Sequence, residues 1–232
     1  DERTWSQPPF TTLIENAIAW TIDDAARQAW QRAPMPEVKY VEGYAVPNYE
    51  ERTPAPQYQL PFSPQDAMRF VQAPGELEIA LFASEPDVVK PITMAFDERG
   101  RLWVIEAHDY PNDVLMGNPG DDIIKILEDT NDDGRADKVT VFADHINLAT
   151  SLVFANSGVI VAAQPDFLFF KDTDGDDRAD VRQVLYTGWG TRDTHAGPSN
   201  LQYGVDNHVW GVVGYSGFNG EINGTHMQFT QG

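Results

Sequence analysis

Hydrophobic and polar positions alternate in short runs along most of the chain. From residue 76 onward, short apolar stretches are separated by turns rich in Gly, Asp and Asn. Such runs are typical of strands in an all-β sandwich, barrel or propeller. The pattern therefore predicts strands at residues 77–82, 102–105, 123–127, 139–142, 158–162, 167–170 and 181–186.

The first 33 residues show a helical spacing instead. Phe10, Leu13, Ile14 and Ala17 occupy positions i, i+3, i+4 and i+7, which favours one apolar face of a helix. A second stretch, residues 23–33, is rich in Ala and contains no Gly or Pro. We therefore predict an N-terminal helical segment over residues 1–33.

Proline dominates the next segment, residues 34–74, with eight prolines in 41 residues. Proline removes a backbone donor and fixes φ, so such a segment holds neither a long helix nor a central strand. We predict an extended linker over residues 34–74. A short helix is expected within it, with Ser63 as N-cap and Pro64 at the first helical position. The β-rich domain then covers residues 75–232.

An internal repeat distinguishes among the all-β folds. Residues 129–137 (DTNDDGRAD) recur as residues 172–180 (DTDGDDRAD), at an offset of 43 residues. A strand, a polar turn and a second strand also recur at residues 96–104, 154–161 and 203–211. Offsets of this size with about four strands per period are typical of β-propeller blades. Only about three blades fit, whereas a closed propeller has roughly four to eight. We therefore predict an incomplete β-propeller, the N-terminal part of a longer one.

Composition and charge exclude several classes of protein. The chain has 16 Lys and Arg against 36 Asp and Glu, a net charge of −20, and nucleic-acid binding needs clustered cations. There is no Cys, which excludes disulfides, thiolate nucleophiles and covalent c-type haem attachment within this stretch. No apolar run reaches the roughly 18 residues of a membrane span. We expect neither a nucleic-acid partner nor a membrane span in this chain.

The repeated Asp-rich loops predict calcium sites. Ca²⁺ takes roughly six to eight oxygen ligands, and side chains at positions 1, 3, 5 and 9 of a tight loop can converge on one ion. Position 12 is Thr140 or Gln183 rather than Glu, so neither loop is an EF-hand. The alternative is a hydrated turn that holds no ion. The candidate ligands are Asp129, Asn131, Asp133 and Asp137 in the first loop and Asp172, Asp174, Asp176 and Asp180 in the second.

Several strings occur together in a way that identifies a family. Residues 82–86 (FASEP), 90–104 (KPITMAFDERGRLWV), 187–190 (TGWG) and 194–201 (THAGPSNL) closely resemble the membrane-bound dehydrogenase domain of Planctomycetes and related bacteria. That family is similar to soluble sugar dehydrogenases that use pyrroloquinoline quinone (PQQ). The region around residues 10–22 resembles the end of a ThuA-like domain. The resemblance implies a periplasmic or extracellular propeller that oxidises a sugar or polysaccharide-derived substrate. Electrons would pass to a cytochrome c-like domain or protein, which carries the haem outside this chain.

The same resemblance implies a catalytic base. In PQQ sugar dehydrogenases a His, followed by Gly and a strand ending in Gly-x-Asp, takes the proton from the anomeric hydroxyl while the hydride passes to the quinone. His195, Gly197 and residues 204–206 match this arrangement, with Asp193 and Arg192 beside the His. Thr194 stands where the family tends to carry Asp. The alternative is a His that braces a loop through hydrogen bonds.

Polar residues at the ends of predicted strands complete the candidate site, because loops at one face of a propeller surround its central channel. Aromatic rings there can stack on sugars, with core packing as the alternative role. We predict a PQQ-dependent sugar or alcohol dehydrogenase-like protein. The alternative is a non-catalytic, calcium-stabilised propeller that binds carbohydrate or a partner protein. The candidate substrate- and cofactor-binding residues are Glu106, His108, Tyr110, Gln164, Trp189, Asn200 and Tyr215.

Overall fold

The computed structural model describes residues 7–21, 23–25, 28, 35–71, 73–74, 76–111 and 119–230. The chain divides into two compact units, residues 1–79 and 80–232, and each is described by itself.

Two helices lie within the described part of the N-terminal unit. Helix α2 covers Pro8–Thr21, which confirms the first helical stretch, whereas the second, residues 23–33, lies largely outside the described residues. Helix α4 covers Pro64–Met68 and begins as predicted, because the Ser63 hydroxyl accepts the backbone N–H of Asp66 at 3.1 Å. The Pro-rich segment also forms a single antiparallel bridge between Tyr40 and Gln59. Within the described residues, no helix is long and apolar enough to cross a membrane.

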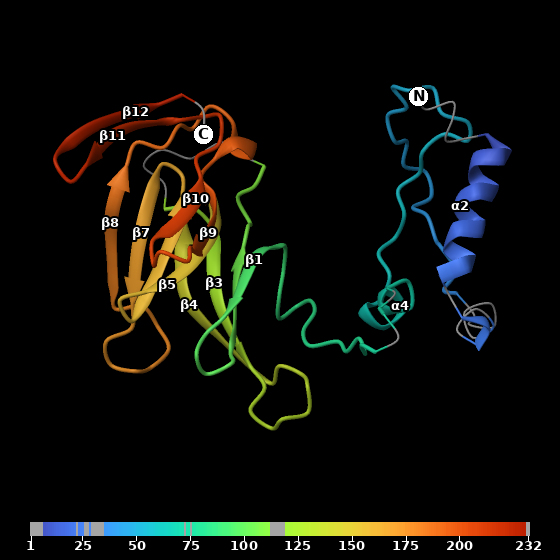
Figure 1. Cartoon of the computed structure of the whole chain (residues 1–232), viewed down its shortest axis with the longest axis horizontal. Coiled ribbons are helices and arrows are strands. Elements are labelled where there is room, and N and C mark those ends of the chain that lie inside the picture. Colours follow the sequence, from blue (N-terminus) through green and yellow to red (C-terminus); the bar gives the residue numbers. More distant parts are fainter. Residues whose placement is uncertain are drawn as a thin grey trace. The chain divides into compact units, whose positions relative to one another are not determined.

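The C-terminal unit is built from antiparallel sheets (Figure 1). In each sheet, strands that follow one another in sequence lie side by side. The prediction of a mostly β unit is confirmed. The first sheet contains β1 (Pro91–Phe96), β2 (Leu102–Glu106), β3 (Asp122–Glu128) and β4 (Lys138–Ile146). The second contains β5 (Ala149–Ala155), β6 (Gly158–Ala163), β7 (Asp166–Lys171) and β8 (Val181–Thr187). Two hairpins follow, β9 (Ser199–Tyr203) with β10 (Val209–Val212), and β11 (Phe218–Ile222) with β12 (Thr225–Phe229).

The prediction of a strand at residues 77–82 is wrong. These residues have no strand conformation. A strand needs a ladder of hydrogen bonds to a neighbour, and the described part of the chain places no strand beside this segment. The carbonyl of Phe82 instead accepts a single bond from the backbone N–H of Ala136 at 2.9 Å.

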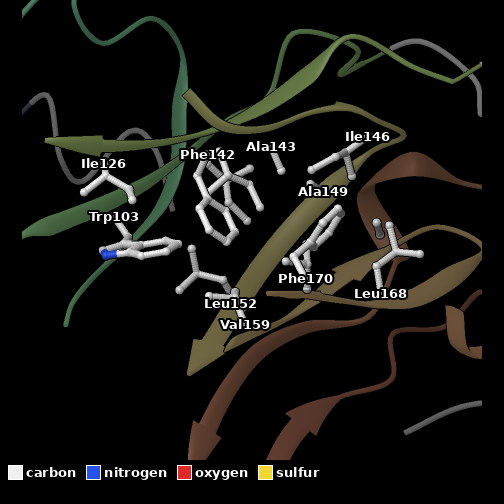
Figure 2. Packing of buried hydrophobic residues seen from close by; sticks show 14 residues of the cluster. Trp103, Ile126, Phe142, Ala143, Ile146, Ala149, Leu152, Val159, Leu168 and Phe170 are labelled. Atoms are coloured by element: carbon white, nitrogen blue, oxygen red, sulfur yellow. The ribbon is translucent and has the colours of Figure 1, made fainter. Parts of the chain in front are cut away.

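The main hydrophobic core lies between the two four-stranded sheets (Figure 2). The Trp103 ring packs edge-on against Phe142 of its own sheet and Phe154 of the second sheet, with centroids 4.5 and 5.2 Å apart. Leu152 and Phe170 extend the core across the second sheet. Burial of a large apolar side chain contributes roughly 1.5–3 kcal/mol, so these contacts hold the sheets face to face.

The strand registers define two ends of the unit. We call the end that holds Glu106, Asp122, Ala149 and Ser199 the His195 end, because the 3₁₀ turn Thr194–Ala196 lies there. The opposite end holds the turns at residues 97–101, 129–137, 172–180 and 204–208. We call it the aspartate-loop end.

A buried arginine joins the two sheets at the aspartate-loop end. Arg101 Nε contacts Asp97 Oδ2 at 2.8 Å, and its Nη1 contacts Asp177 Oδ1 at 2.6 Å. The Trp103 indole N–H also donates to Asp97 Oδ2 at 3.0 Å. Asp97 lies in the turn between β1 and β2 of the first sheet and Asp177 in a loop of the second sheet, so this cluster fixes the junction between the sheets.

Candidate functional site

Three side chains meet at the turn that carries His195. Asp193 caps the turn, and its Oδ1 accepts the backbone N–H of His195 at 2.8 Å. The same oxygen lies 2.8 Å from His195 Nδ1. The Tyr215 hydroxyl donates to the other carboxylate oxygen, Oδ2. Asp193 therefore holds the histidine on one side and the tyrosine on the other.

Asp193 is ionised throughout the physiological pH range. The hydrogen bond from Tyr215 and the two from His195 lower the pKa of Asp193 from 3.8 to about 2. The carboxylate in turn raises the pKa of the Tyr215 hydroxyl. An ionised carboxylate accepts hydrogen bonds and donates none. His195 Nδ1 must therefore carry a proton in the contact, which leaves Nε2 of the neutral ring with its lone pair.

His195 borders a hollow of about 340 Å³ at its end of the unit. The His195 side chain is 64% exposed, and the Tyr110 ring lies edge-on to it with centroids 5.2 Å apart. Of the predicted site residues, the hollow brings together His195, Tyr110 and Asn200. The other lining residues come from both four-stranded sheets, the loop between them, and the segment from the 3₁₀ turn to β9: Ile92, Ala107, Asp122, Leu148, Ala149, Thr150, Thr194, Gly197 and Ser199.

Gln164, predicted as a binding residue, is not among the residues that line the hollow. It is buried, and its amide Nε2 donates to the carbonyl of Gly190 at 2.7 Å. Gly197 approaches so closely that a Cβ there would lie 2.7 Å from Gln164 Cδ. Gln164 thus supports the loop that carries His195 through its contacts with Gly190 and Gly197. Its Oε1 is buried without a hydrogen-bond partner among the described residues.

The side chains of Trp189 and Arg192 are also engaged in contacts within the protein. The Trp189 ring stacks on Phe167 with centroids 4.7 Å apart and contacts Phe218 at 4.8 Å. Packing between two rings is the alternative role foreseen for this residue. Arg192 Nη2 donates to the carbonyl of Tyr215 at 3.0 Å, and this bond ties the two segments that bear Asp193 and Tyr215.

Glu106 and His108 form a separate cluster near the end of β2. The buried Glu106 carboxylate contacts Lys125 Nζ at 2.7 Å, His108 Nε2 at 2.9 Å and the backbone N–H of Val89 at 2.9 Å. Burial alone would raise the pKa of Glu106, but these three contacts outweigh it and lower the pKa. With its oxygens engaged, Glu106 anchors the segment before β1.

Sequence reasoning missed Asp122, a buried carboxyl that lines the hollow. Its oxygens accept the backbone N–H groups of Asp109 at 2.9 Å and Ala149 at 2.7 Å. Burial raises the pKa of Asp122 despite these bonds. Because Asp109 precedes Tyr110, Asp122 links the loop that bears Tyr110 to the start of β5. An Asp directly before a predicted strand was the available signal, and many such residues are solvated.

The second Asp-rich loop brings three of its four predicted ligand positions together. In the second loop, carboxylate oxygens of Asp172, Asp174 and Asp176 all lie within 4.8 Å of one another, a spacing compatible with a bound cation. The loop backbone also uses these carboxylates. Asp172, for example, accepts the N–H groups of Gly175 at 2.7 Å and Asp177 at 2.9 Å. The loop is therefore also stabilised without an ion.

The first loop has the same geometry with one ligand changed. Asp129 accepts the N–H of Gly134 at 2.7 Å, and the Asn131 side-chain oxygen accepts that of Asp133 at 3.0 Å. The ninth positions stand apart in both loops. Asp137 accepts the Thr130 hydroxyl at 2.8 Å, and Asp180 accepts the Thr173 hydroxyl at 2.7 Å.

Comparison with known proteins gives one family. A family model described as a domain of unknown function, DUF7133, matches residues 63–232. No curated protein matches the chain. The match covers the whole unit that carries both the hollow and the aspartate loops.

Proposed function

This chain belongs to the DUF7133 family, and on that premise we propose that it carries a general-base site for a sugar or alcohol in an exported, dehydrogenase-like protein. His195 is the proposed base and Asp193 its positioning residue. Tyr110 and Asn200 are proposed to contact the substrate in the hollow beside it.

The Asp193–His195 contact carries the proposal. A carboxylate with a pKa of about 2 at 2.8 Å from Nδ1 favours the tautomer in which Nε2 is unprotonated. A neutral imidazole of this kind accepts a proton from a hydroxyl group at neutral pH. In the reaction, the positive charge on the ring would be stabilised by the same carboxylate.

The hollow supports a small polar substrate. Its volume of about 340 Å³ falls in the range of small-molecule sites, roughly 300–1,000 Å³. Ser199 and Asn200 offer a hydroxyl and an amide group, and the Tyr110 ring offers an apolar face. A sugar needs this mixture, since its hydroxyls require hydrogen bonds and its C–H faces pack on aromatic rings.

The lining does not fit PQQ, whose three carboxylates need cationic partners. Among the described residues that line the hollow, none is Lys or Arg. The cations nearby are engaged, since Arg192 bonds the carbonyl of Tyr215 and Lys90 bonds that of Tyr110 at 2.9 Å. We therefore limit the proposed role of these residues to substrate binding and proton acceptance. The PQQ and cytochrome c-like partners stay predictions.

The absence of Lys and Arg among the described residues that line the hollow also favours a second candidate function, that of a non-catalytic module. A non-catalytic module would bind the sugar in the same hollow without turnover, and calcium at the aspartate loops would stabilise it. Asp172, Asp174 and Asp176 are the proposed ligands of that ion. The two candidates differ in whether His195 changes turnover or only affinity.

For the fold, we infer that the two sheets are successive blades of a propeller and that β9 and β10 begin a third. Each sheet is a four-stranded antiparallel meander, as blades are. The turn that opens the first blade also recurs in the third. Trp103 donates its indole N–H to Asp97, and Trp210 donates its own to Asp206, both at 3.0 Å.

A matched pair of histidine variants tests the function. The protein is screened against sugars and alcohols with a dye as electron acceptor, with and without PQQ and calcium. His195→Asn is compared with His208→Asn, because His208 also lies beside an Asp two residues earlier, at 3.3 Å. Turnover lost in His195→Asn and kept in His208→Asn supports the proposal. Equal turnover in the wild type and both variants contradicts it, and binding without turnover supports the module.

A further inference from the structure

The first strands of three successive repeats occupy equivalent positions, which makes their burial directly comparable. Phe96, Phe154 and Tyr203 each pair with the first apolar residue of the next strand, namely Leu102, Val159 and Val209. Two residues before each aromatic residue stand Met94, Leu152 and Leu201. These three side chains therefore point to the same face of their respective sheets.

Burial of these three side chains differs sharply. Leu152 is 4% exposed and Leu201 is 9% exposed, because each packs against the sheet that precedes it. Met94 is 69% exposed, and Phe96 beside it is 67% exposed. Ile92, one more alternate position along β1, is half-exposed. The face that contacts a preceding sheet in the second and third repeats is therefore open over β1 in the first. On β2 and β3 of the same face, Leu102, Val104 and Leu127 are buried against Phe82, Ala83 and Val88.

One edge of that open face is already occupied. Ala179, the eighth residue of the second aspartate loop, donates its N–H to the carbonyl of Phe142 at 2.8 Å. Ala136, the eighth residue of the first loop, donates in the same way to the carbonyl of Phe82 at 2.9 Å. Phe142 belongs to β4, the outermost strand of the first sheet. Residues 80–83 therefore contact the aspartate loop of the first sheet in the same way as β4 contacts the aspartate loop of the second sheet.

We propose that a further blade of the same polypeptide covers Ile92, Met94 and Phe96, with residues 80–83 as its outermost strand. The proposal rests on the propeller arrangement inferred above. The position of residues 80–83 favours the same polypeptide over a second copy, because one strand of the covering blade is then already in place. Once paired, these residues would adopt the strand conformation that their sequence predicts.

The chemistry of this junction is apolar. Between the first and second sheets, Arg101 bonds Asp177, the sixth residue of the second aspartate loop. The sixth residue of the first loop is Gly134, which offers no carboxylate. The covering blade is therefore expected to present an aromatic or aliphatic side chain at the position of Trp103, packed on Met94 and Phe96.

Oxidation of Met94 tests the proposal directly. The protein purified from its natural source and the isolated 232-residue chain are treated with hydrogen peroxide, and sulfoxide formation is followed by mass spectrometry. Met35, exposed in the N-terminal unit, serves as the internal reference. Relative to Met35, Met94 is expected to oxidise about tenfold more slowly in the natural protein than in the isolated chain.

Two results would overturn the proposal. Equal relative rates in both proteins would mean that nothing covers the face. Protection of Met94 already in the isolated chain would mean that another occupant covers it, a second copy if the protection depends on concentration and residues 1–79 if it does not. Neither result depends on turnover, so a failure here is separate from a failure of the His195 proposal.

A pair of variants controls for damage to the sheet itself. Met94→Glu is expected to lower the melting temperature of the natural protein and to leave the isolated chain unchanged. Val184→Glu, at an exposed position on the outer strand β8, is expected to change neither. An equal loss from Met94→Glu in both proteins would show that the substitution harms β1 rather than its contact with a covering blade.

Discussion

Two histidines of this chain lie two residues after an aspartate, and their surroundings differ. Asp193 and His195 are 2.8 Å apart, Tyr215 holds the second carboxylate oxygen, and the ring borders the hollow beside Tyr110. Asp206 and His208 are 3.3 Å apart, at the opposite end of the strands, and the His208 side chain is 78% exposed. The spacing Asp-x-His sets up the local contact in both, because the carboxylate caps the turn.

What differs is the third partner. The indole N–H of Trp210 holds Asp206 at 3.0 Å, so that aspartate fastens a turn to its own hairpin. The Tyr215 hydroxyl comes from a segment beyond the hairpin and holds Asp193 beside an open hollow. The same Asp-x-His spacing therefore stabilises a turn in one place and positions a candidate base in the other.

Removal of each carboxylate charge is expected to give the largest contrast. Asp193→Asn no longer fixes the Nδ1–H tautomer, so turnover should fall by about 100-fold, a typical contribution of general-base catalysis. Asp206→Asn should leave turnover unchanged, because His208 lies away from the hollow. Steady-state kinetics with the dye acceptor measures both. Equal losses would mean that both carboxylates act on folding rather than on chemistry.

Removal of the support below the His195 loop comes next. Gln164→Ala deletes a buried amide that bonds Gly190 and packs against Gly197, and the lost packing and hydrogen bond should cost about 2 kcal/mol of unfolding free energy. The His208 turn has an exposed side chain at Val205, so Val205→Ala should change stability by less than about 0.5 kcal/mol. Urea unfolding measures both values. A neutral Gln164→Ala would show that the loop holds its shape without this support.

Substitution of the third partners, Tyr215 and Trp210, should change the pKa of the aspartate that each one contacts. Tyr215→Phe removes the bond that most lowers the pKa of Asp193, so this pKa should rise from about 2 toward 3.8. Since the folded pKa is the lower one, ionised Asp193 stabilises the fold above pH 3.8, and the effect is lost as the pH falls from 3.8 through about 2. The stability difference between wild type and variant should therefore shrink through this range and vanish only below the folded pKa of about 2. Trp210→Phe should raise the pKa of Asp206 in the same direction. Carboxyl NMR titrations follow both groups, and an unchanged Asp193 pKa would contradict the role of Tyr215.

The smallest effect is expected from calcium, which should change neither the Asp193–His195 contact nor the Asp206–His208 contact. The aspartate loops lie at the end opposite His195, so occupancy of the site at Asp172, Asp174 and Asp176 should raise the melting temperature without changing affinity for substrate. Calorimetric titration with Asp174→Asn as control measures the binding. Absence of heat at millimolar calcium would identify the loops as hydrated turns.

The sequence predicted the strands well where neighbours in sequence are also neighbours in the sheet. Residues 102–105 and 123–127, for instance, fall within β2 and β3. It failed at residues 77–82, because strand conformation there depends on a pairing partner rather than on the residues themselves. A periodic pattern reports which side chains can be buried, and only the fold decides what covers them.

The site was harder to predict than the strands. His195 and Asp193 are close in sequence, so their contact follows from local turn geometry. The role of Tyr215 required the fold, since Gly214 at φ +75° lets its segment approach the carbonyl of Ala196, where a Cβ would lie 2.2 Å away. Asp122 was missed because its burial comes from packing between two sheets, which no local pattern in the sequence shows.

The tautomer of His195 tests the central claim most directly. A long-range ¹H–¹⁵N NMR spectrum of the protein at neutral pH distinguishes a protonated Nδ1 from a protonated Nε2 in a neutral ring. The account predicts that His195 carries its proton on Nδ1, with Nε2 free to accept one, and that Asp193→Asn abolishes this preference. A His195 ring with its proton on Nε2 would contradict the account, because such a ring has no lone pair to offer a substrate on that side.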